Sequence, residues 1–368
     1  MLVRLRTTTS DAAQGAGVAG EHGAVAVRGS LRDRLNRRVR YVRMSLTDRC
    51  NLRCTYCMPR EGVDHVDRAE LLTFEEIERL AAVLAGLGVT KIRLTGGEPT
   101  LRRDLPDLVR RLRSIPSTDS ADGRLRVFMT TNGILLPGLA AALAEAGLCG
   151  LTVSLDTLDP DKFRALTRAG ALPRVIEGVE AARVAGQPGL KLNTVAIRGF
   201  NDEELHALCR FAWERGMTPR FIETMPMAGG ALYVPGELMP AVQVRAQIAG
   251  QLGAFVRPHH GGDFEAAGPA SYWRVDGGAD DGRVFGTIGA MTENFCERCN
   301  RLRISARGQL HGCLAYDDAF DLRAALRHGE ESAVARVLGA TLGAKRPAHD
   351  FRLDGGGGPA KPMIGIGG

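Results

Sequence analysis

The stretch Cys50-Asn51-Leu52-Arg53-Cys54-Thr55-Tyr56-Cys57 places three cysteines within eight residues, in the pattern C-x3-C-x2-C. Closely spaced thiolates on a loop are the ligands that soft metals take. A structural zinc ion needs four ligands, and no further Cys or His follows before His65. A [4Fe–4S] cluster is ordinarily held by four Cys thiolates, so three would leave one iron with an open position. The full spacing favours such a cluster, and the alternative is a zinc site with a distant fourth ligand.

The eight cysteines form two groups of three and two isolated residues. Metal sites explain this grouping better than disulfides do. Thiols that bind iron must stay reduced, which indicates the cytoplasm. Cys149 and Cys209 lie in apolar or helical patterns and are interpreted as small buried residues. The two groups are Cys50, Cys54 and Cys57, and Cys296, Cys299 and Cys313.

The net charge of +6 is concentrated at the start of the chain of 368 residues. Residues 1–40 hold eight Arg against three acidic residues, so the remainder is nearly neutral. A nearly neutral body argues against nucleic-acid binding. The sequence contains no run of 18 apolar residues, so no membrane helix is expected. Residues 1–39 are rich in Gly, Ala, Thr and Arg. We expect them to form a disordered leader, with an organelle transit peptide as the alternative.

Residues 40–226 alternate between strand and helix patterns. Thr73 and Glu76 form a capping box before a helix that Gly88 ends, and Asn201 is expected to cap a later helix. Alternating strands and helices predict a parallel sheet, and six strands are fewer than the eight of a closed barrel. The sequence therefore predicts an α/β fold with a partial (βα)6 barrel. The predicted strands cover residues 41–46, 90–94, 125–130, 151–155, 191–197 and 220–224.

After residue 226 the alternation ends. We interpret residues 227–345 as a C-terminal lobe, with short strands near 271–276, 283–288 and 301–305 around the second cysteine group. Residues 346–368 are rich in Gly and are predicted to be a tail that ends in Gly367 and Gly368.

A second motif, Gly96-Gly97-Glu98-Pro99, follows a predicted strand. Two glycines at a strand end let the backbone approach a ligand closely, although they also suit a simple tight turn. Together with the C-x3-C-x-aromatic-C motif, this element resembles the radical S-adenosylmethionine (SAM) enzymes. The resemblance implies a partial barrel of six βα units and a first [4Fe–4S] cluster whose open iron chelates SAM. It also implies the SAM contacts Tyr56, Gly97, Ser154 and Met225.

The second cysteine group is Cys296-Glu297-Arg298-Cys299, followed by Cys313. His311 offers an alternative, because it would complete a zinc site. The chain resembles one radical SAM family over residues 40–368. The resemblance rests on the two groups of three cysteines, the run from Phe295 to Arg303 and the final double glycine. That family is the GTP 3′,8-cyclases, which catalyse the first step of molybdenum cofactor biosynthesis.

This resemblance implies a second [4Fe–4S] cluster and GTP as the substrate. Arg suits polyphosphate because its planar fork stays charged and donates bidentate hydrogen bonds. No Walker A motif occurs, so a P-loop is not expected. The implied GTP contacts are Arg43, Arg93, Thr130, Lys191, Arg301 and Arg303, and the implied catalytic residues are Arg301, Arg303, Gly367 and Gly368.

The resemblance also implies partners: a one-electron donor such as a flavodoxin or ferredoxin, and a downstream cyclic pyranopterin monophosphate synthase. A monomer or homodimer is expected. Two alternatives stay open from the residues. One is another two-cluster radical SAM enzyme that acts on a peptide, and the other is a non-enzymatic iron–sulfur or zinc protein.

Overall fold

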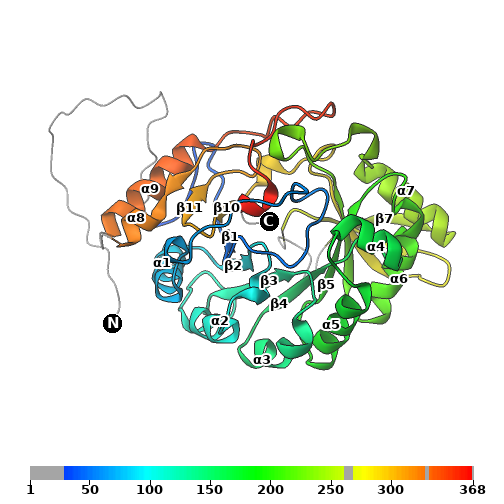
Figure 1. Cartoon of the computed structure of the whole chain (residues 1–368), viewed down its shortest axis with the longest axis horizontal. Coiled ribbons are helices and arrows are strands. Elements are labelled where there is room, and N and C mark those ends of the chain that lie inside the picture. Colours follow the sequence, from blue (N-terminus) through cyan, green and yellow to red (C-terminus); the bar gives the residue numbers. More distant parts are fainter. Residues whose placement is uncertain (1–28, 261–267, 328–330, 367–368) are drawn as a thin grey trace.

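The computed structural model describes residues 29–260, 268–327 and 331–366. Its framework is a curved sheet in which the first six strands lie side by side in sequence order and run parallel (Figure 1). This arrangement confirms the predicted α/β class with six consecutive parallel strands. The strands are β1 (Tyr41–Ser45), β2 (Lys91–Thr95), β3 (Arg126–Thr131), β4 (Gly150–Ser154), β5 (Lys191–Ala196) and β6 (Thr218–Glu223).

Helices cover the outer face of these strands (Figure 1). The first helix begins as predicted, because Oγ1 of Thr73 accepts a hydrogen bond from the N–H of Glu76, whose carboxylate accepts one from the N–H of Thr73. Ile77, Leu80 and Leu84 of this helix are fully buried. An apolar stripe therefore seats the helix on the sheet. The helices are α1 (Phe74–Gly86), α2 (Leu105–Ser114), α3 (Ala140–Glu145), α4 (Pro160–Thr167), α5 (Leu172–Val184) and α6 (Leu205–Glu214).

The helix cap predicted at Asn201 is wrong. The side chain of Asn201 accepts no hydrogen bond from the following helical turn. Its amide instead donates to the backbone oxygens of Asp156 and Val195, at 2.7 and 2.9 Å. Asn201 is fully buried, and it joins the loop that follows β4 to the end of β5.

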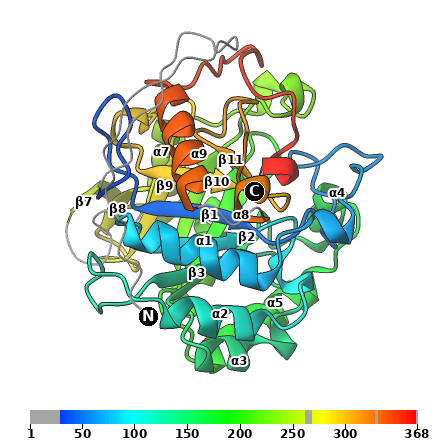
Figure 2. The same cartoon turned by 90° about the vertical axis from the view of Figure 1, so that its left-hand side faces the viewer.

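The residues after 226 extend both sides of the same sheet. Strand β10 (Arg301–Ile304) pairs with β1 and β9 (Val284–Ile288) pairs with β6, both in parallel. The strand order is therefore β12-β11-β10-β1-β2-β3-β4-β5-β6-β9-β8-β7. Helices α8 and α9 pack over β11, next to α1 (Figure 2). The further elements are α7 (Ala241–Leu252), β7 (Phe255–His259), β8 (Ser271–Asp276), β11 (Gln309–His311), β12 (Phe320–Asp321), α8 (Leu322–Arg327) and α9 (Glu331–Ala344).

The predicted leader extends too far into the fold. Leu31 and Val39 are fully buried in the core, and the backbone of Leu31 is hydrogen-bonded to that of Val39 and of Leu87. Residues 29–39 are therefore part of the folded body, and the prediction of disorder is wrong for them. The other leader residues, 1–28, lie outside the described residues, as do Gly367 and Gly368. In the described ranges, no helix has the length and apolar character needed to cross a membrane.

Candidate active site

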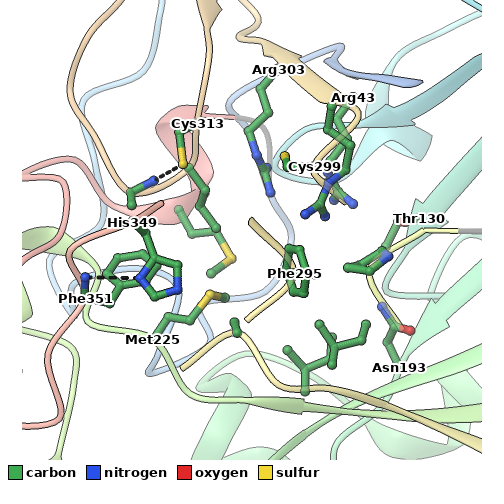
Figure 3. Close-up of a pocket in the computed structure, with 18 of the residues that line it drawn as sticks. Arg43, Thr130, Asn193, Met225, Phe295, Cys299, Arg303, Cys313, His349 and Phe351 are labelled. Carbon is green, nitrogen blue, oxygen red and sulfur yellow. Dashed lines mark hydrogen bonds between the residues drawn. The ribbon is translucent and has the colours of Figure 1, made fainter. Parts of the chain in front are cut away.

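A cavity on the concave face of the sheet is lined by the second cysteine group and by Tyr56 of the first cysteine loop (Figure 3). Residues of β1 to β6 and β10 line it, together with the loop of the second cysteine group and part of the C-terminal tail. Parallel strands end at the same edge, so residues distant in sequence meet there. Eleven of the predicted site residues line the cavity: Arg43, Tyr56, Arg93, Thr130, Ser154, Met225, Cys296, Cys299, Arg301, Arg303 and Cys313.

Positive charge dominates the concave face. Alternate residues of a strand point to one side, and register pairs Arg43 of β1 with Arg93 of β2 and with Arg303 of β10. The inward-facing positions of β1 to β6 and β10 carry no Asp or Glu. Like charges crowded into a partly buried face are costly, so this face suits a polyanionic ligand. The inward-facing cations are Arg43, Lys91, Arg93, Arg126, Lys191, Arg220, Arg301 and Arg303.

Arg93 is the centre of a hydrogen-bond network within this face. Its Nε donates to the hydroxyl of Tyr41 at 2.7 Å, and one terminal nitrogen donates to the hydroxyls of Thr130 and Thr152 at 3.1 and 3.0 Å. Burial raises the pKa of Tyr41, but Arg93 and Arg43 outweigh it and lower this pKa to about 7. The network holds the guanidinium in one orientation beside the cavity.

The lysines of the concave face are affected by the same crowding. Burial lowers the pKa of Lys191 to about 7, and Arg220 and Arg93 add to the effect. Burial likewise lowers the pKa of Lys91 to about 8. Lys191 does not line the cavity itself; it lies two residues before Asn193, which does. Both ammonium groups would be stabilised by a nearby phosphate.

Arg301 and Arg303 bring the second cysteine group to this face. The guanidinium of Arg301 lies over the ring of Phe295, 4.5 Å from its centroid. Burial lowers the pKa of Arg303 well below its usual range, and Arg43 adds to the shift. Figure 3 shows Arg43 and Arg303 pointing toward the same region of the cavity, beside Cys299. The two arginines therefore define a strongly cationic end of the site.

The first cysteine group lies on the loop after β1, against the glycine motif. The N–H of Gly97 donates to Thr47 O at 2.6 Å, and the N–H of Glu98 donates to Arg49 O at 2.7 Å. A Cβ on Gly97 would collide with the Arg49 carbonyl. Position 97 therefore requires glycine, because the loop after β2 packs here against the backbone of the segment that precedes Cys50. Gly97 and the three cysteines do not line the cavity as it stands.

The thiols of this group are buried. Burial and the neighbouring Cys50 raise the pKa of Cys57 to about 12, against a hydrogen bond from the N–H of Ile364. Burial also raises the pKa of Cys54 well above its usual range. The contact with Ile364 brings the C-terminal tail beside the first cysteine group. Bound metal is what stabilises such buried thiols as thiolates.

Tyr56 and Asp156 connect the first cysteine loop to the end of β4. The hydroxyl of Tyr56 donates to a carboxylate oxygen of Asp156 at 2.7 Å, and the other oxygen accepts from the N–H of Val195 at 2.7 Å. Burial raises the pKa of Asp156 to about 6. Ser154 lies two residues before Asp156, and Met225 lines the cavity near His349 (Figure 3).

The second cysteine group is held by long-range contacts. Arg37 donates from one terminal nitrogen to the backbone oxygen of Cys296 at 2.8 Å. Burial raises the pKa of Cys299, but Lys345 and Arg301 outweigh it and lower this pKa to about 7. The two cations therefore stabilise the thiolate of Cys299 relative to that of an ordinary cysteine.

The donor set of each cysteine group consists of three thiols. His311 is engaged elsewhere, because its Nδ1 contacts the backbone oxygen of Asp318 at 3.0 Å. Three thiols on each loop are the ligand chemistry of an iron–sulfur cluster, so the donor sets fit that group.

The sequence prediction missed several residues that line the cavity. Arg220 and Asn193 lie inside apolar strand patterns, and alternation with buried neighbours was the signal that could have identified them. His349, Phe351 and Met363 belong to the segment interpreted as a tail. The ring of His349 stacks on that of Phe351 with centroids 4.8 Å apart (Figure 3). No local motif marked these three residues.

Comparison with known proteins identifies two family models that match the chain. The radical SAM superfamily matches residues 44–212, and Molybdenum Cofactor Synthesis C matches residues 217–351. A GTP 3′,8-cyclase of Pelotomaculum thermopropionicum is 43% identical over 88% of this chain and 96% of its own length. A GTP 3′,8-cyclase of Moorella thermoacetica is 40% identical over 92% of this chain and 100% of its own length.

Solved structures resemble the chain more weakly. The [FeFe]-hydrogenase maturase HydG matches with a TM-score of 0.45 and 16% identity, over 57% of this chain and 48% of its own. This likeness is too slight to carry an argument about the site.

Proposed function

The chain belongs to the GTP 3′,8-cyclase family of radical SAM enzymes, and on this premise we propose how its residues divide the work. The enzyme converts GTP to (8S)-3′,8-cyclo-7,8-dihydroguanosine 5′-triphosphate, the first step of molybdenum cofactor biosynthesis. The roles of single residues, the second cluster and the electron donor belong to the proposal.

The cationic concave face binds the triphosphate of GTP. It faces the cavity that the second cysteine group and Tyr56 line, and the inward-facing positions of its strands carry eight cations and no Asp or Glu. This is the observation that carries the assignment, because a polyphosphate satisfies charges that are otherwise costly to bury. The proposed contacts are Arg43, Arg93, Thr130, Lys191, Arg301 and Arg303.

The first cysteine group holds the cluster that binds SAM. When bound and reduced, this cluster supplies the electron that splits SAM into methionine and a 5′-deoxyadenosyl radical. Gly97 brings backbone close to the methionine end, Ser154 at the end of β4 and Tyr56 on the cysteine loop lie beside it, and Met225 packs on the adenine. Tyr56 is held in place through Asp156.

The second cysteine group holds the other cluster and orients the guanine. Arg301 and Arg303 belong to β10, which begins two residues after Cys299. They therefore fix the nucleotide relative to Cys296, Cys299 and Cys313. Positioning of this kind matters because the hydrogen at C3′ must lie within reach of the radical carbon. Removal of this hydrogen leaves a C3′ radical, which bonds to C8 of guanine, and one further electron and one proton complete the product.

Gly367 and Gly368 reach the reacting groups and act there through backbone atoms. The described residues before them support this, because Met363 lines the cavity and Ile366 is fully buried. Residues without Cβ suit a space shared by two ligands.

A flavodoxin or ferredoxin supplies the electrons that the clusters need. The cysteine thiols must stay reduced to bind iron, which favours the cytoplasm as the compartment.

The alternatives receive less support. A peptide-modifying radical SAM enzyme has no need for so many inward-facing cations, and the identity with GTP 3′,8-cyclases extends over both domains. A zinc-binding protein without enzymatic activity is disfavoured by the same identity, which covers 88% of this chain.

One experiment tests the proposal. The anaerobically reconstituted enzyme should contain about eight iron and eight sulfide per chain, as two [4Fe–4S] clusters require. With dithionite, SAM and GTP it should release 5′-deoxyadenosine together with the cyclised nucleotide. Cys54→Ser should abolish 5′-deoxyadenosine release while the second cluster remains. SAM cleavage that is unaffected in this variant, or cleavage without a GTP-derived product in the wild type, would refute the assignment.

A further inference from the structure

Lys345 is a buried lysine whose ammonium group lies against the second cysteine group. It follows the last residue of α9 and is only 7% exposed. Its Nζ lies 3.6 Å from Sγ of Cys299 and 3.2 Å from the backbone oxygen of Arg301. It also donates to the backbone oxygen of Gly312. Lys345 thus uses its donors on atoms of the cluster-binding segments.

These contacts join two separate segments of the chain. Arg301 lies two residues after Cys299, and Gly312 directly precedes Cys313. One ammonium group therefore holds together the backbone that carries two of the three cysteines. Replacement of this group would release both segments from each other at this point.

The charge of Lys345 also needs a partner. A buried ammonium is costly unless an opposite charge compensates it. The two backbone oxygens satisfy hydrogen bonds but carry no net charge. Among the described residues no carboxylate pairs with Lys345. The thiolate of Cys299 is the anion within reach, so lysine and thiolate form the ion pair.

The first cysteine group has different surroundings. The sulfur of Cys50 accepts from the N–H of Leu52 at 3.4 Å and from the side-chain amide of Asn132 at 3.9 Å. Both of these donors are uncharged. The sulfur of Cys299, by contrast, has the ammonium group of Lys345 beside it.

We propose that Lys345 is a positioning residue for the second iron–sulfur cluster and that its fixed positive charge raises the reduction potential of that cluster. The inference rests on the proposed function only in taking Cys296, Cys299 and Cys313 as cluster ligands. Reduction adds one negative charge to the cluster and its thiolates. A cation beside a ligand sulfur stabilises the reduced form more than the oxidised form.

This charge separates the tasks of the two clusters. An electron is held more firmly on the second cluster, and the first, whose ligand Cys50 accepts from uncharged donors, stays the stronger reductant. Cleavage of SAM requires a strong reductant, so the difference directs the reducing power to the end of the cavity where SAM binds. Lys345 thereby serves the reaction without contact with either small molecule.

The test is a redox titration of the anaerobically reconstituted, full-length enzyme, followed by EPR, with iron and sulfide counted in each sample. Lys345→Met and Lys345→Gln remove the charge, and Lys345→Arg keeps it. Arg346→Met is the matched control, because it removes one positive charge from an adjacent side chain that is exposed. A Cys50→Ala/Cys54→Ala/Cys57→Ala background isolates the signal of the second cluster.

We expect the potential of the second cluster to shift to more negative values in Lys345→Met and Lys345→Gln. It should stay near the wild-type value in Lys345→Arg and Arg346→Met, and the first cluster should not shift. Assembly of the second cluster in Lys345→Arg but in neither neutral variant also supports the proposal, because the charge is then what holds the ligand segments together. An unchanged potential in the neutral variants overturns it, as does loss of the cluster in all three substitutions. These readouts do not depend on cyclisation of GTP, so failure of the proposed function is seen separately.

Discussion

The hydroxyl of Tyr56 donates a 2.7 Å hydrogen bond to the carboxylate of Asp156, which lies one hundred residues further along the chain. The bond connects the first cysteine loop to the end of β4, where Ser154 also lies. Asp156 is buried and accepts a second hydrogen bond from the N–H of Val195. The cysteine loop is therefore fixed to the sheet at the point where SAM is proposed to bind.

Tyr56→Phe should weaken SAM binding and lower the rate of SAM cleavage. The substitution leaves a buried carboxylate oxygen without its donor, which costs about 1–3 kcal/mol. Equilibrium binding of SAM and the release of 5′-deoxyadenosine measure the effect. Tyr316→Phe is the control, because it removes a tyrosine hydroxyl bond at the exposed backbone oxygen of Ala348. Equal SAM affinity in Tyr56→Phe and the wild type would contradict the role of this bond.

Arg303→Ala should weaken GTP binding and retain both clusters. Loss of a charge-assisted hydrogen bond costs about 1.5–3 kcal/mol, which corresponds to roughly 10- to 150-fold in the dissociation constant. Calorimetry with intact iron content checks this value. Arg307→Ala, at an exposed position just beyond β10, is expected to bind GTP normally. If both variants bind alike, Arg303 does not contact the nucleotide.

GTP binding should be accompanied by proton uptake at pH 8. Burial, with Arg220 and Arg93, lowers the pKa of Lys191 to about 7, so its ammonium is largely deprotonated at pH 8 in the free enzyme. A bound triphosphate favours the charged form and raises this pKa. Affinity should therefore be independent of pH below pH 7, where Lys191 is charged before and after binding, and should fall as pH rises above 7.

Calorimetry at pH 8 in two buffers with different ionisation enthalpies measures these protons. Lys191→Met should reduce the uptake and flatten the pH dependence. Lys91, whose pKa burial lowers to about 8, accounts for part of what remains. The same proton uptake in Lys191→Met and the wild type would exclude Lys191 from the phosphate site.

Arg37→Ala should destabilise the protein and loosen the second cysteine group. Arg37 forms a buried ion pair with Asp33 at 2.6 Å and also binds the backbone oxygen of Cys296. Breaking such a pair strands a buried carboxylate, which costs about 3–5 kcal/mol. Urea unfolding and iron per chain are the measurements, with exposed Arg34→Ala as the control. Deletion of residues 1–39 should be as harmful, since it removes Arg37, Leu31 and Val39.

Deletion of Gly367 and Gly368 should spare both clusters, SAM binding and much of the GTP affinity, yet abolish or cripple cyclisation. The reason is that these residues are proposed to act beside the reacting groups. An alanine added after Gly368 should have nearly the same effect, because its Cβ needs space there. Product formation is measured alongside 5′-deoxyadenosine and iron content. Full cyclisation by the shortened chain would refute this role.

Local patterns were sufficient to predict the first six strands. Each has an apolar face that is buried and ends near a turn signal, and the capping box at Thr73 marks the first helix. The motif cysteines were equally evident, since their spacing is local. The pairing of β10 with β1 and of β9 with β6 was not predicted, because no sequence pattern reports which distant strands are neighbours.

The same limit applies to the site. Arg220 and Lys345 each lie in or at the end of a regular element, where a cation usually signals a solvated face. Their burial comes from residues brought in by other strands and loops: Asn193 for Arg220 and Gly312 for Lys345. Residues 29–39 were predicted to be disordered from composition, although a few apolar residues, Leu31 and Val39, anchor them.

The parallel pairing of β1 with β10 has a consequence for biosynthesis of the protein. During translation β1 is made near the start of the chain, whereas Arg301–Ile304 emerge only when most of it has left the ribosome. Until then β1 has an open edge, and unpaired edges invite association with other chains. Contacts this distant in sequence also form slowly. The strand before the first cysteine group and the strand that follows Cys299 are thus paired late, after most of the chain has been made.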